Sequence, residues 1–344
     1  MAILLNNYVI VNKEDNYQEN FMKQTPGKHR LRKKELVSNI FSLFSERYDS
    51  TDEKSIFNLT ISISEIQIYL EERCNVKYTS STWIYTQIKR YEDILGVHLF
   101  KKIKSPDNPE NFDIAIYEGM TSFTQFQHLY LTHKLKIANG IYDQIKNSIE
   151  TWKTNVSLKI LLGSGTNIYH LANIISGRSK EDKIHYHLYT HNLGVINNLM
   201  EPENISEYIT LYTPAGKIDT IGNTIVGDDN TFYLSTKFDF IIQSTNTIFN
   251  NKLYVHTKEE SIRKQVILKE CSGIKILALV MDEFKTTRDD SMFCYGELSD
   301  NDFIIVPKTR SKREAEYERM FKKMDSFMIP EIVHWNYVIY KVIK

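Results

Sequence analysis

The sequence contains few cysteines, and no two of them are placed to act together. Cys74, Cys271 and Cys294 are widely spaced, and no CxxC pair occurs. An odd, scattered set of this kind excludes a disulfide framework and a zinc site built on paired cysteines. We therefore expect buried thiols, no metal centre and no cofactor.

Long hydrophobic runs are also missing. The longest, residues 274–281, is interrupted by Lys275 and falls far short of the roughly 20 residues that cross a bilayer. Residues 1–11 lack the basic region and the long apolar region of a signal peptide. The sequence therefore predicts a soluble cytoplasmic protein with no membrane partner.

The chain has no overall excess of either charge. Lysine and arginine together number 43, as do aspartate and glutamate, so no whole-molecule field attracts the protein to nucleic acid. Local excesses do occur, because residues 23–34 contain six lysines or arginines and no acid, and residues 77–104 contain six against two acids. We expect modest non-specific affinity for DNA, with binding dependent on specific contacts.

What is present is typical of a globular protein with more than one domain. The 344 residues are 42% hydrophobic and 25% charged, with 13 glycines and 7 prolines, which excludes collagen-like and largely disordered chains. At roughly 100–200 residues per domain, two or three domains fit this length.

The first half predicts a basic arm, a small DNA-binding fold and a long helix. Residues 1–34 form the arm. Helical apolar spacing over about 35–48, 64–73 and 79–95, followed by two strands, predicts an α+β winged helix-turn-helix domain at 35–118. Residues 119–152 carry one apolar stripe and predict a linker helix of about 50 Å, which either packs across a domain or pairs with a second copy. Gly140 could bend this helix, so the prediction does not require a single unbroken rod.

The helix predicted at 79–95 carries side chains suited to reading DNA. In a helix-turn-helix the second helix enters the major groove, where short hydrogen-bonding side chains meet base edges and flanking cations meet phosphates. The candidate DNA contacts are Arg30, Arg32, Lys77, Ser80, Ser81, Thr82, Tyr85, Thr86, Gln87, Lys89, Arg90, Lys101, Lys102 and Lys104.

One block of this half resembles a known family. Residues 87–100, Q-I-K-R-Y-E-D-I-L-G-V-H-L-F, are similar to the recognition-helix block of LysR-type regulators, with Tyr91 where leucine is usual. The stretch before Ser80 lacks that family's A-A-x-x-L signature. The resemblance implies double-stranded DNA as a partner, a wing and a dimerising linker helix.

The second half changes to short apolar runs that alternate with helical stretches. The runs lie at about 158–162, 184–189, 208–212, 238–242, 274–281 and 303–306. This alternation predicts an α/β domain with a mostly parallel sheet over residues 157–344.

A glycine-containing turn is the clearest ligand signal of this domain. Residues 161–167, L-L-G-S-G-T-N, follow a predicted strand and precede a predicted helix. Glycines let the backbone approach a ligand, and amides at a helix start favour an anion. The turn is neither a Walker loop nor a G-x-G-x-x-G fingerprint, and a tight turn without ligand would use the same residues.

A series of short motifs resembles the effector domain of DeoR-type sugar-sensing repressors, which is related in fold to ribose-5-phosphate isomerase and glucosamine-6-phosphate deaminase. The motifs here are G-T-N at 165–167, T-H-N at 190–192, A-G at 215–216, V-G at 226–227, F-D-F at 238–240 and D-x-x-K at 282–285. The resemblance implies a phosphorylated effector, either a sugar phosphate or a nucleotide-like molecule. The candidate ligand contacts are Gly163, Ser164, Gly165, Thr166, Asn167, Thr190, His191, Asn192, Gly216, Lys217, Asp282 and Lys285.

The sequence favours binding over catalysis in this domain. Isomerases of the related fold carry an Asp-rich run after the strand that corresponds to 238–242, and this chain has Gln243-Ser244-Thr245-Asn246 there. Glu259 or Glu260 could supply a base for proton abstraction if a loop brought it close, but we expect both to lie in a solvated turn, which leaves a binding pocket without catalysis.

The sequence thus predicts a ligand-responsive transcriptional regulator, acting as a homodimer or higher homo-oligomer. Two alternatives stay open. One is a phosphosugar isomerase or deaminase with an interaction module, and the other is an adaptor whose winged helix contacts protein.

Overall fold

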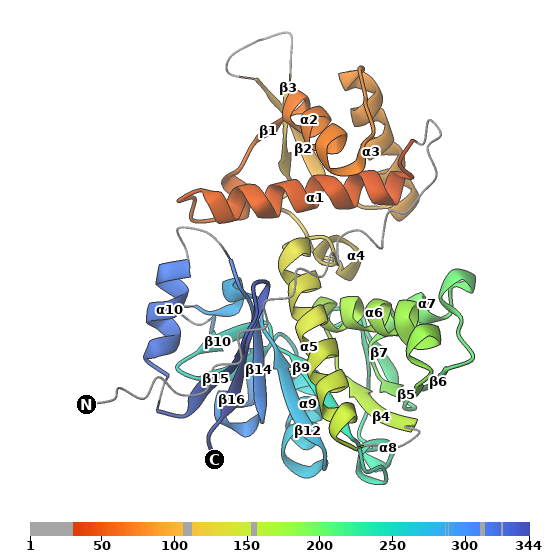
Figure 1. Cartoon of the computed structure of the whole chain (residues 1–344), viewed down its shortest axis with the longest axis vertical. Coiled ribbons are helices and arrows are strands. Elements are labelled where there is room, and N and C mark those ends of the chain that lie inside the picture. The colour runs from red at the N-terminus through yellow and green to blue at the C-terminus, as the bar shows by residue number, and fades with distance from the viewer. Residues whose placement is uncertain are drawn as a thin grey trace. The chain divides into compact units, whose positions relative to one another are not determined.

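The computed structural model describes residues 30–105, 112–152, 157–285, 287, 289–309, 314–324 and 326–344. The described chain divides into two compact units, one that extends to Thr132 and one formed by His133–Thr309 and Glu314–Lys344 (Figure 1). Most of the predicted arm, residues 1–29, lies outside the described residues.

The first unit contains three helices and a small antiparallel sheet. The helices are α1 (Lys33–Ser50), α2 (Ile63–Cys74) and α3 (Ser81–Leu95), and a 3₁₀ turn, η2 (Ile56–Asn58), follows α1. The strands β1 (Ile61–Ser62), β3 (Phe112–Ile116) and β2 (Phe100–Lys104) are neighbours in that order. Phe41, Phe44 and Phe100 stack in the core between α1 and β2.

Capping residues set the ends of the second and third helices. The Ser62 hydroxyl accepts from the amide of Glu65, whose carboxylate accepts from the amide of Ser62, so α2 begins at this capping box. The Ser80 hydroxyl accepts from the amide of Trp83 at the start of α3. α3 ends at Gly96, whose φ of 66° is the left-handed conformation that glycine adopts most readily.

The single long helix predicted over 119–152 is not continuous. It is split into a short turn, α4 (Phe123–Phe126), and α5 (Leu131–Trp152). Tyr130 has a φ of 53°, a left-handed conformation that cannot continue a right-handed helix.

The apolar stripe of α5 is buried within the chain itself. Ile137, Ile141 and Ile145 have no exposed surface, so they are not available to a second copy, and the homodimer stays a prediction. Gly140 lies within α5. A Cβ there would meet the Tyr337 ring at 2.8 Å, so this glycine lets α5 pack closely against Tyr337.

The second unit is an α/β fold built on one large, mostly parallel sheet, as the sequence predicted. Six strands are parallel, and two antiparallel strands complete one edge. The order across the sheet is β15 (Met328–Val333), β16 (Tyr337–Val342), β14 (Phe303–Pro307), β12 (Ile274–Ala278), β9 (Phe240–Ser244), β4 (Ser157–Leu162), β5 (His185–Thr190) and β6 (Ile209–Tyr212).

Helices and two small antiparallel sheets accompany this sheet (Figure 1). The helices are α6 (Thr166–Asp182), α7 (Leu193–Leu199), α8 (Thr231–Leu234), α9 (Lys258–Glu270) and α10 (Glu314–Lys322), with 3₁₀ turns η3 (Pro202–Asn204), η4 (Met281–Glu283) and η5 (Leu298–Asp300). One small sheet pairs β7 (Lys217–Asp219) with β8 (Thr224–Val226), and the other orders β10 (Thr247–Phe249), β11 (Lys252–Val255) and β13 (Phe293–Glu297).

The three thiols differ in exposure. Cys271 is buried and Cys74 is half-buried, whereas Cys294 is exposed, so the prediction that all three are buried is wrong for Cys294. Its edge position on β13 leaves the side chain accessible. Among the described residues, no helix is both long and apolar enough to cross a membrane.

Candidate functional site

The centre of the large sheet is a topological switch point. From β4 the chain moves outward through β5 and β6, then returns to β9 on the other side of β4 and continues to β12 and β14. In open parallel sheets, ligands bind where the carboxyl ends of such diverging strands leave a crevice. The turn after β4 and the end of β9 therefore define the candidate site.

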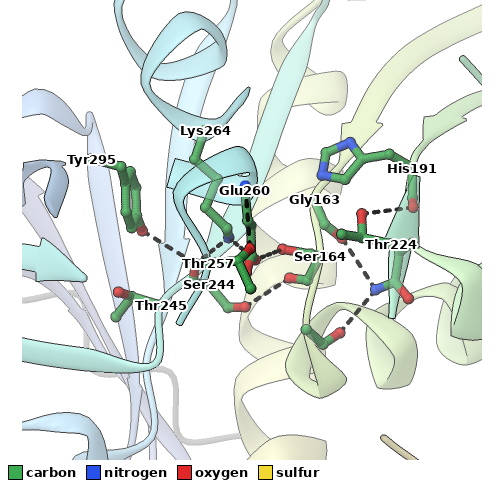
Figure 2. A network of polar contacts seen from close by, with 12 residues as sticks. Gly163, Ser164, His191, Thr224, Ser244, Thr245, Thr257, Glu260, Lys264 and Tyr295 are labelled. Atoms are coloured by element: carbon green, nitrogen blue, oxygen red, sulfur yellow. Dashed lines mark hydrogen bonds and ion pairs between the residues drawn. The ribbon is translucent and has the colours of Figure 1, made fainter. Parts of the chain in front are cut away.

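The predicted glycine turn lies at this position. Gly165 has a φ of 105°, which favours glycine, and a Cβ there would collide with the Ser244 hydroxyl at the end of β9. The Ser244 hydroxyl donates to the carbonyl of Ser164 at 2.8 Å. The ends of β4 and β9 are thus joined directly (Figure 2).

A buried carboxylate, that of Glu260, lies against this turn. The sequence predicted an anionic ligand there and a solvated position for Glu260. The Ser164 hydroxyl, predicted to donate to an anion, donates to Glu260 Oε1 instead. Glu260 lies in the first turn of α9 and is 5% exposed. The prediction of a solvated turn at Glu260 is wrong, because α9 packs this turn against the sheet. Glu259 beside it is exposed and lies 3.8 Å from Lys217.

Lys264 completes the network one helical turn further along α9. Its Nζ lies 3.8 Å from Glu260 Oε1 and donates to the carbonyl of Ser244 at 2.6 Å. The Tyr295 hydroxyl donates to the same carbonyl at 3.2 Å. Lys264 is 1% exposed, and burial lowers its pKa, while the Glu260 carboxylate opposes that shift. Figure 2 shows these side chains converging from β9, α9 and β13 on the turn after β4.

The predicted residues after β5 line the other side of the turn. Asn192 Nδ2 donates to the carbonyls of Gly163 and Gly165 at 3.2 and 3.0 Å. The Thr190 hydroxyl donates to the carbonyl of Leu162 at 2.7 Å. These two side chains therefore support the turn, and their polar groups are committed to the protein backbone.

His191 is buried and held neutral. Its Nδ1 is 3.1 Å from the Tyr233 hydroxyl. Burial, together with the positive charges of Lys264 and Arg263, lowers the pKa of His191 to about 3. The imidazole lies beside Gly163 in Figure 2.

Three of the described residues, at the start of α6 and at the ends of β5 and β9, carry buried polar atoms without hydrogen-bond partners. These atoms are His191 Nε2, both amide atoms of Gln243 and, in the first turn of α6, Asn167 Oδ1, none of which has a hydrogen-bond partner among the described residues. Leu162 is in register with Thr190 on one side and Ile242 on the other. The next position along each strand therefore places Gly163 between His191 and Gln243. An unsatisfied buried polar atom costs about 1–3 kcal/mol, so a polar ligand that paired with these atoms would recover part of that cost.

Four other predicted ligand contacts, Gly216, Lys217, Asp282 and Lys285, make their contacts in other parts of the unit, whereas Thr166 and Asn167 belong to the glycine turn itself. Lys217 and Lys285 are exposed and lie near the carboxylates of Glu259 and Asp282. Gly216 lies beside Val226 at the small β7–β8 sheet. Thr166 is the first residue of α6, and Asn167 Nδ2 donates to Glu283 Oε1 at 3.3 Å. Burial raises the pKa of Glu283 to about 8.

Sequence reasoning missed Lys264 and Gln243 and misplaced Glu260. One local signal could have indicated the pair on α9, because Glu260 and Lys264 are four residues apart and share one helical face. Nothing local distinguishes a buried pair of this kind from a solvated one.

The first unit presents a separate basic face on α3 and β2. Ser80, Thr82 and Arg90 are exposed on α3, and Lys102 and Lys104 are exposed on β2. Lys102 Nζ lies 3.9 Å from the centre of the Phe112 ring and 5.5 Å from that of Tyr85. At the start of α3, the Arg30 guanidinium lies 5.4 Å from the Trp83 ring. Aromatic rings of α3 and β3 thus lie against two cations of the first unit, Arg30 and Lys102.

Several predicted DNA contacts have other roles in the structure. Gln87 is 9% exposed, because it lies on the stripe of α3 that faces the core, so its predicted contact with bases is wrong. Lys77 and Lys101 are paired with Glu71 and Glu118. Lys89 Nζ lies 2.6 Å from Glu92 Oε2. The remaining candidates with at least part of their surface exposed are Arg30, Arg32, Ser80, Ser81, Thr82, Tyr85, Thr86, Arg90, Lys102 and Lys104.

Comparison with known proteins gives no family. No family model matches the chain, and no curated protein matches its sequence. Among solved structures, ribose 5-phosphate isomerase from Plasmodium falciparum is similar at 13% identity and a TM-score of 0.30, over 61% of this chain and 79% of that chain. Ribose 5-phosphate isomerase A from Methanocaldococcus jannaschii matches the same shares at 12% identity and 0.28. eIF2B delta from Chaetomium thermophilum matches 81% of this chain and 90% of that chain at 9% identity and 0.31. At TM-scores and identities this low, these similarities do not indicate a function for this chain.

Proposed function

We propose that the chain is a ligand-responsive DNA-binding transcriptional regulator. The observation that carries this proposal is the basic face of α3 and β2, where exposed hydroxyl side chains on the helix lie beside cations supported by aromatic rings. Short polar side chains suit base edges, and cations suit phosphates.

In this proposal the first unit acts as a winged helix-turn-helix. α3 enters the major groove by its N-terminal turns, where Ser80 and Thr82 are exposed. The β2–β3 hairpin is the wing, and Lys102 and Lys104 on β2 contact the phosphate backbone. A homodimer would place two such helices about 34 Å apart on a pseudo-palindromic site.

The effector is proposed to bind at the switch point of the large sheet. A phosphorylated small molecule that approaches the turn at 163–167 meets Glu260, which already accepts from the Ser164 hydroxyl. Binding therefore requires that the effector displace the Glu260 carboxylate from Ser164. Such a displacement gives two states of the α9 start, and an effector that favours one of them shifts the population.

DNA binding is tested with a charge-matched pair of variants. Removing two phosphate contacts with Arg90→Ala/Lys102→Ala is expected to weaken binding to a site selected from random duplexes and to reduce the slope of log K against log salt by about 2. Arg47→Ala/Lys54→Ala removes two cations outside α3 and β2 and is expected to leave both quantities unchanged. Failure of the wild-type protein to enrich any site in the selection contradicts the proposal.

A second candidate function is supported by one observation. The buried Glu260 beside the glycine turn supplies the carboxylate that the sequence seemed to lack, so a phosphosugar isomerase or deaminase is a competing proposal.

One panel of sugar phosphates and nucleotides separates the two functions. For an effector site, Glu260→Gln removes the competing charge and is expected to lower the Kd of a phosphorylated ligand, measured by thermal shift. For an enzyme, the same variant is expected to abolish turnover of ribose 5-phosphate or glucosamine 6-phosphate. Glu259→Gln, at the exposed neighbour, is the control that should change neither. Stabilisation by no compound of the panel contradicts the effector site, and absence of turnover in the wild type contradicts the enzyme.

A further inference from the structure

We propose that His185 and His187 on β5 form a binding site for a divalent late transition metal such as Cu²⁺. Alternate residues of a strand point to the same face of a sheet, so the two imidazoles are neighbours. Their ring centroids are 5.1 Å apart, and their planes are inclined by 39°. Neither histidine belongs to the glycine turn, which follows β4.

The spacing of the rings suits two ligands of one metal. A metal–nitrogen bond is about 2.0–2.1 Å long. With an angle at the metal between square-planar and tetrahedral values, such bonds place two imidazole centroids about 4.5–5.2 Å apart. The observed separation of 5.1 Å lies within that interval.

Hydroxyl groups on the adjacent strand orient both rings. His185 Nε2 lies 3.1 Å from the Thr210 hydroxyl, and His187 Nδ1 lies 3.3 Å from the Tyr212 hydroxyl, both on β6. When these nitrogens donate to the hydroxyls, His185 Nδ1 and His187 Nε2 keep their lone pairs for a metal. A hydrogen bond from the second nitrogen is the usual support of a metal-binding histidine.

The side chains near the two histidines indicate which class of metal would bind. Within the described residues, no cluster of three or more histidine, cysteine or acidic side chains is placed to hold a metal, so two imidazoles and water make up the ligand set. Imidazole nitrogen without carboxylates favours copper, nickel and zinc over magnesium and calcium, with copper bound most tightly. Lys159 on β4 is exposed and in register with His187, and its charge weakens the binding of any cation.

Titration of the full-length, tag-free protein with Cu²⁺ tests the site. The expected result is one saturable site whose electron paramagnetic resonance spectrum shows coupling to two nitrogens. His185→Asn and His187→Asn should each weaken binding at least tenfold, and Thr210→Val should weaken it about 10-fold while both nitrogens remain. Lys159→Gln should strengthen binding.

His256→Asn is the matched control, since His256 is an exposed histidine of the same unit, and it should bind Cu²⁺ as the wild type does. Retained far-ultraviolet circular dichroism in each variant establishes that the fold is intact. Saturable binding that survives in the His185→Asn/His187→Asn double variant, or a wild-type spectrum with fewer than two coupled nitrogens, overturns the site.

Discussion

Exchange of Lys264 for methionine is expected to lower the free energy of unfolding of the α/β unit by about 3–5 kcal/mol. Lys264 is 1% exposed, and its ammonium lies 3.8 Å from the buried Glu260 carboxylate. Methionine fills a similar volume but leaves that carboxylate in the interior without a cation. It also leaves the carbonyl of Ser244 without the 2.6 Å hydrogen bond from Nζ. Urea denaturation measures the change.

The double variant distinguishes a charge effect from a packing effect. The double variant Lys264→Met/Glu260→Gln removes both charges of the pair, so neither is left buried without its partner. Its free energy of unfolding should therefore be closer to that of the wild type than the value for Lys264→Met alone. Lys285→Met provides a control, because Lys285 lies 3.1 Å from Asp282 in a pair that is more than one-third exposed on each side. An exposed pair of this kind contributes about 0–1 kcal/mol. If the double variant is as unstable as Lys264→Met alone, the charge argument fails.

Exchange of Glu92 for alanine is expected to destabilise the first unit by about 3–6 kcal/mol. Glu92 is 3% exposed, and its Oε1 accepts from the amides of Leu99 and Phe100 at 2.7 and 2.8 Å. Alanine leaves both amides unsatisfied at the start of β2. Hydrogen bonds to a charged group contribute about 1.5–3 kcal/mol each, and the effect of two is large for a small unit.

The prediction is tested by comparing the thermal unfolding midpoint of Glu92→Ala with that of Asp93→Ala. Asp93 is the exposed neighbour on the same helix, so its replacement removes an equal charge without removing a backbone partner. Glu92→Gln keeps one acceptor oxygen and should fall between the two. Equal midpoints for Glu92→Ala and Asp93→Ala would show that the amides of Leu99 and Phe100 do not depend on this carboxylate.

Residues 87–100, interpreted from the sequence as a recognition-helix block, build one corner of the first unit. Glu92 holds the amides that open β2, Gly96 supplies the left-handed turn, and Leu99 and Phe100 are buried. All four residues form the corner between α3 and β2. These residues therefore account for the local fold, and the proposed DNA contacts are other residues of α3 and β2.

Local signals allowed much of the fold to be predicted. Ser80 and Gly96 mark the ends of α3, because capping depends on residues within a few positions. The parallel strands of the large sheet follow from continuous apolar runs such as the one at β12. The glycine turn was located correctly because it lies directly between β4 and α6.

The features that escaped prediction depend on distant partners. Glu260 is buried because Ser164, 96 positions away, lies against it, and no local pattern contains that information. Gln87 resembled a base-reading side chain in sequence, but the packing of α3 turned it to the core. Tyr130 interrupts the predicted helix because its backbone is left-handed. A tyrosine in the sequence gives no indication of that conformation.

The position of β4 between β5 and β9 also has a consequence for the order of folding. β4 pairs with β5 across a short separation, whereas the contact between Lys159 N and Asp239 Oδ2 at the start of β9 spans 80 positions. Long loops close more slowly than short ones. The β4–β5–β6 half can therefore form before β9 joins it, and the Ser164–Glu260 contact forms only after the two halves of the sheet have met.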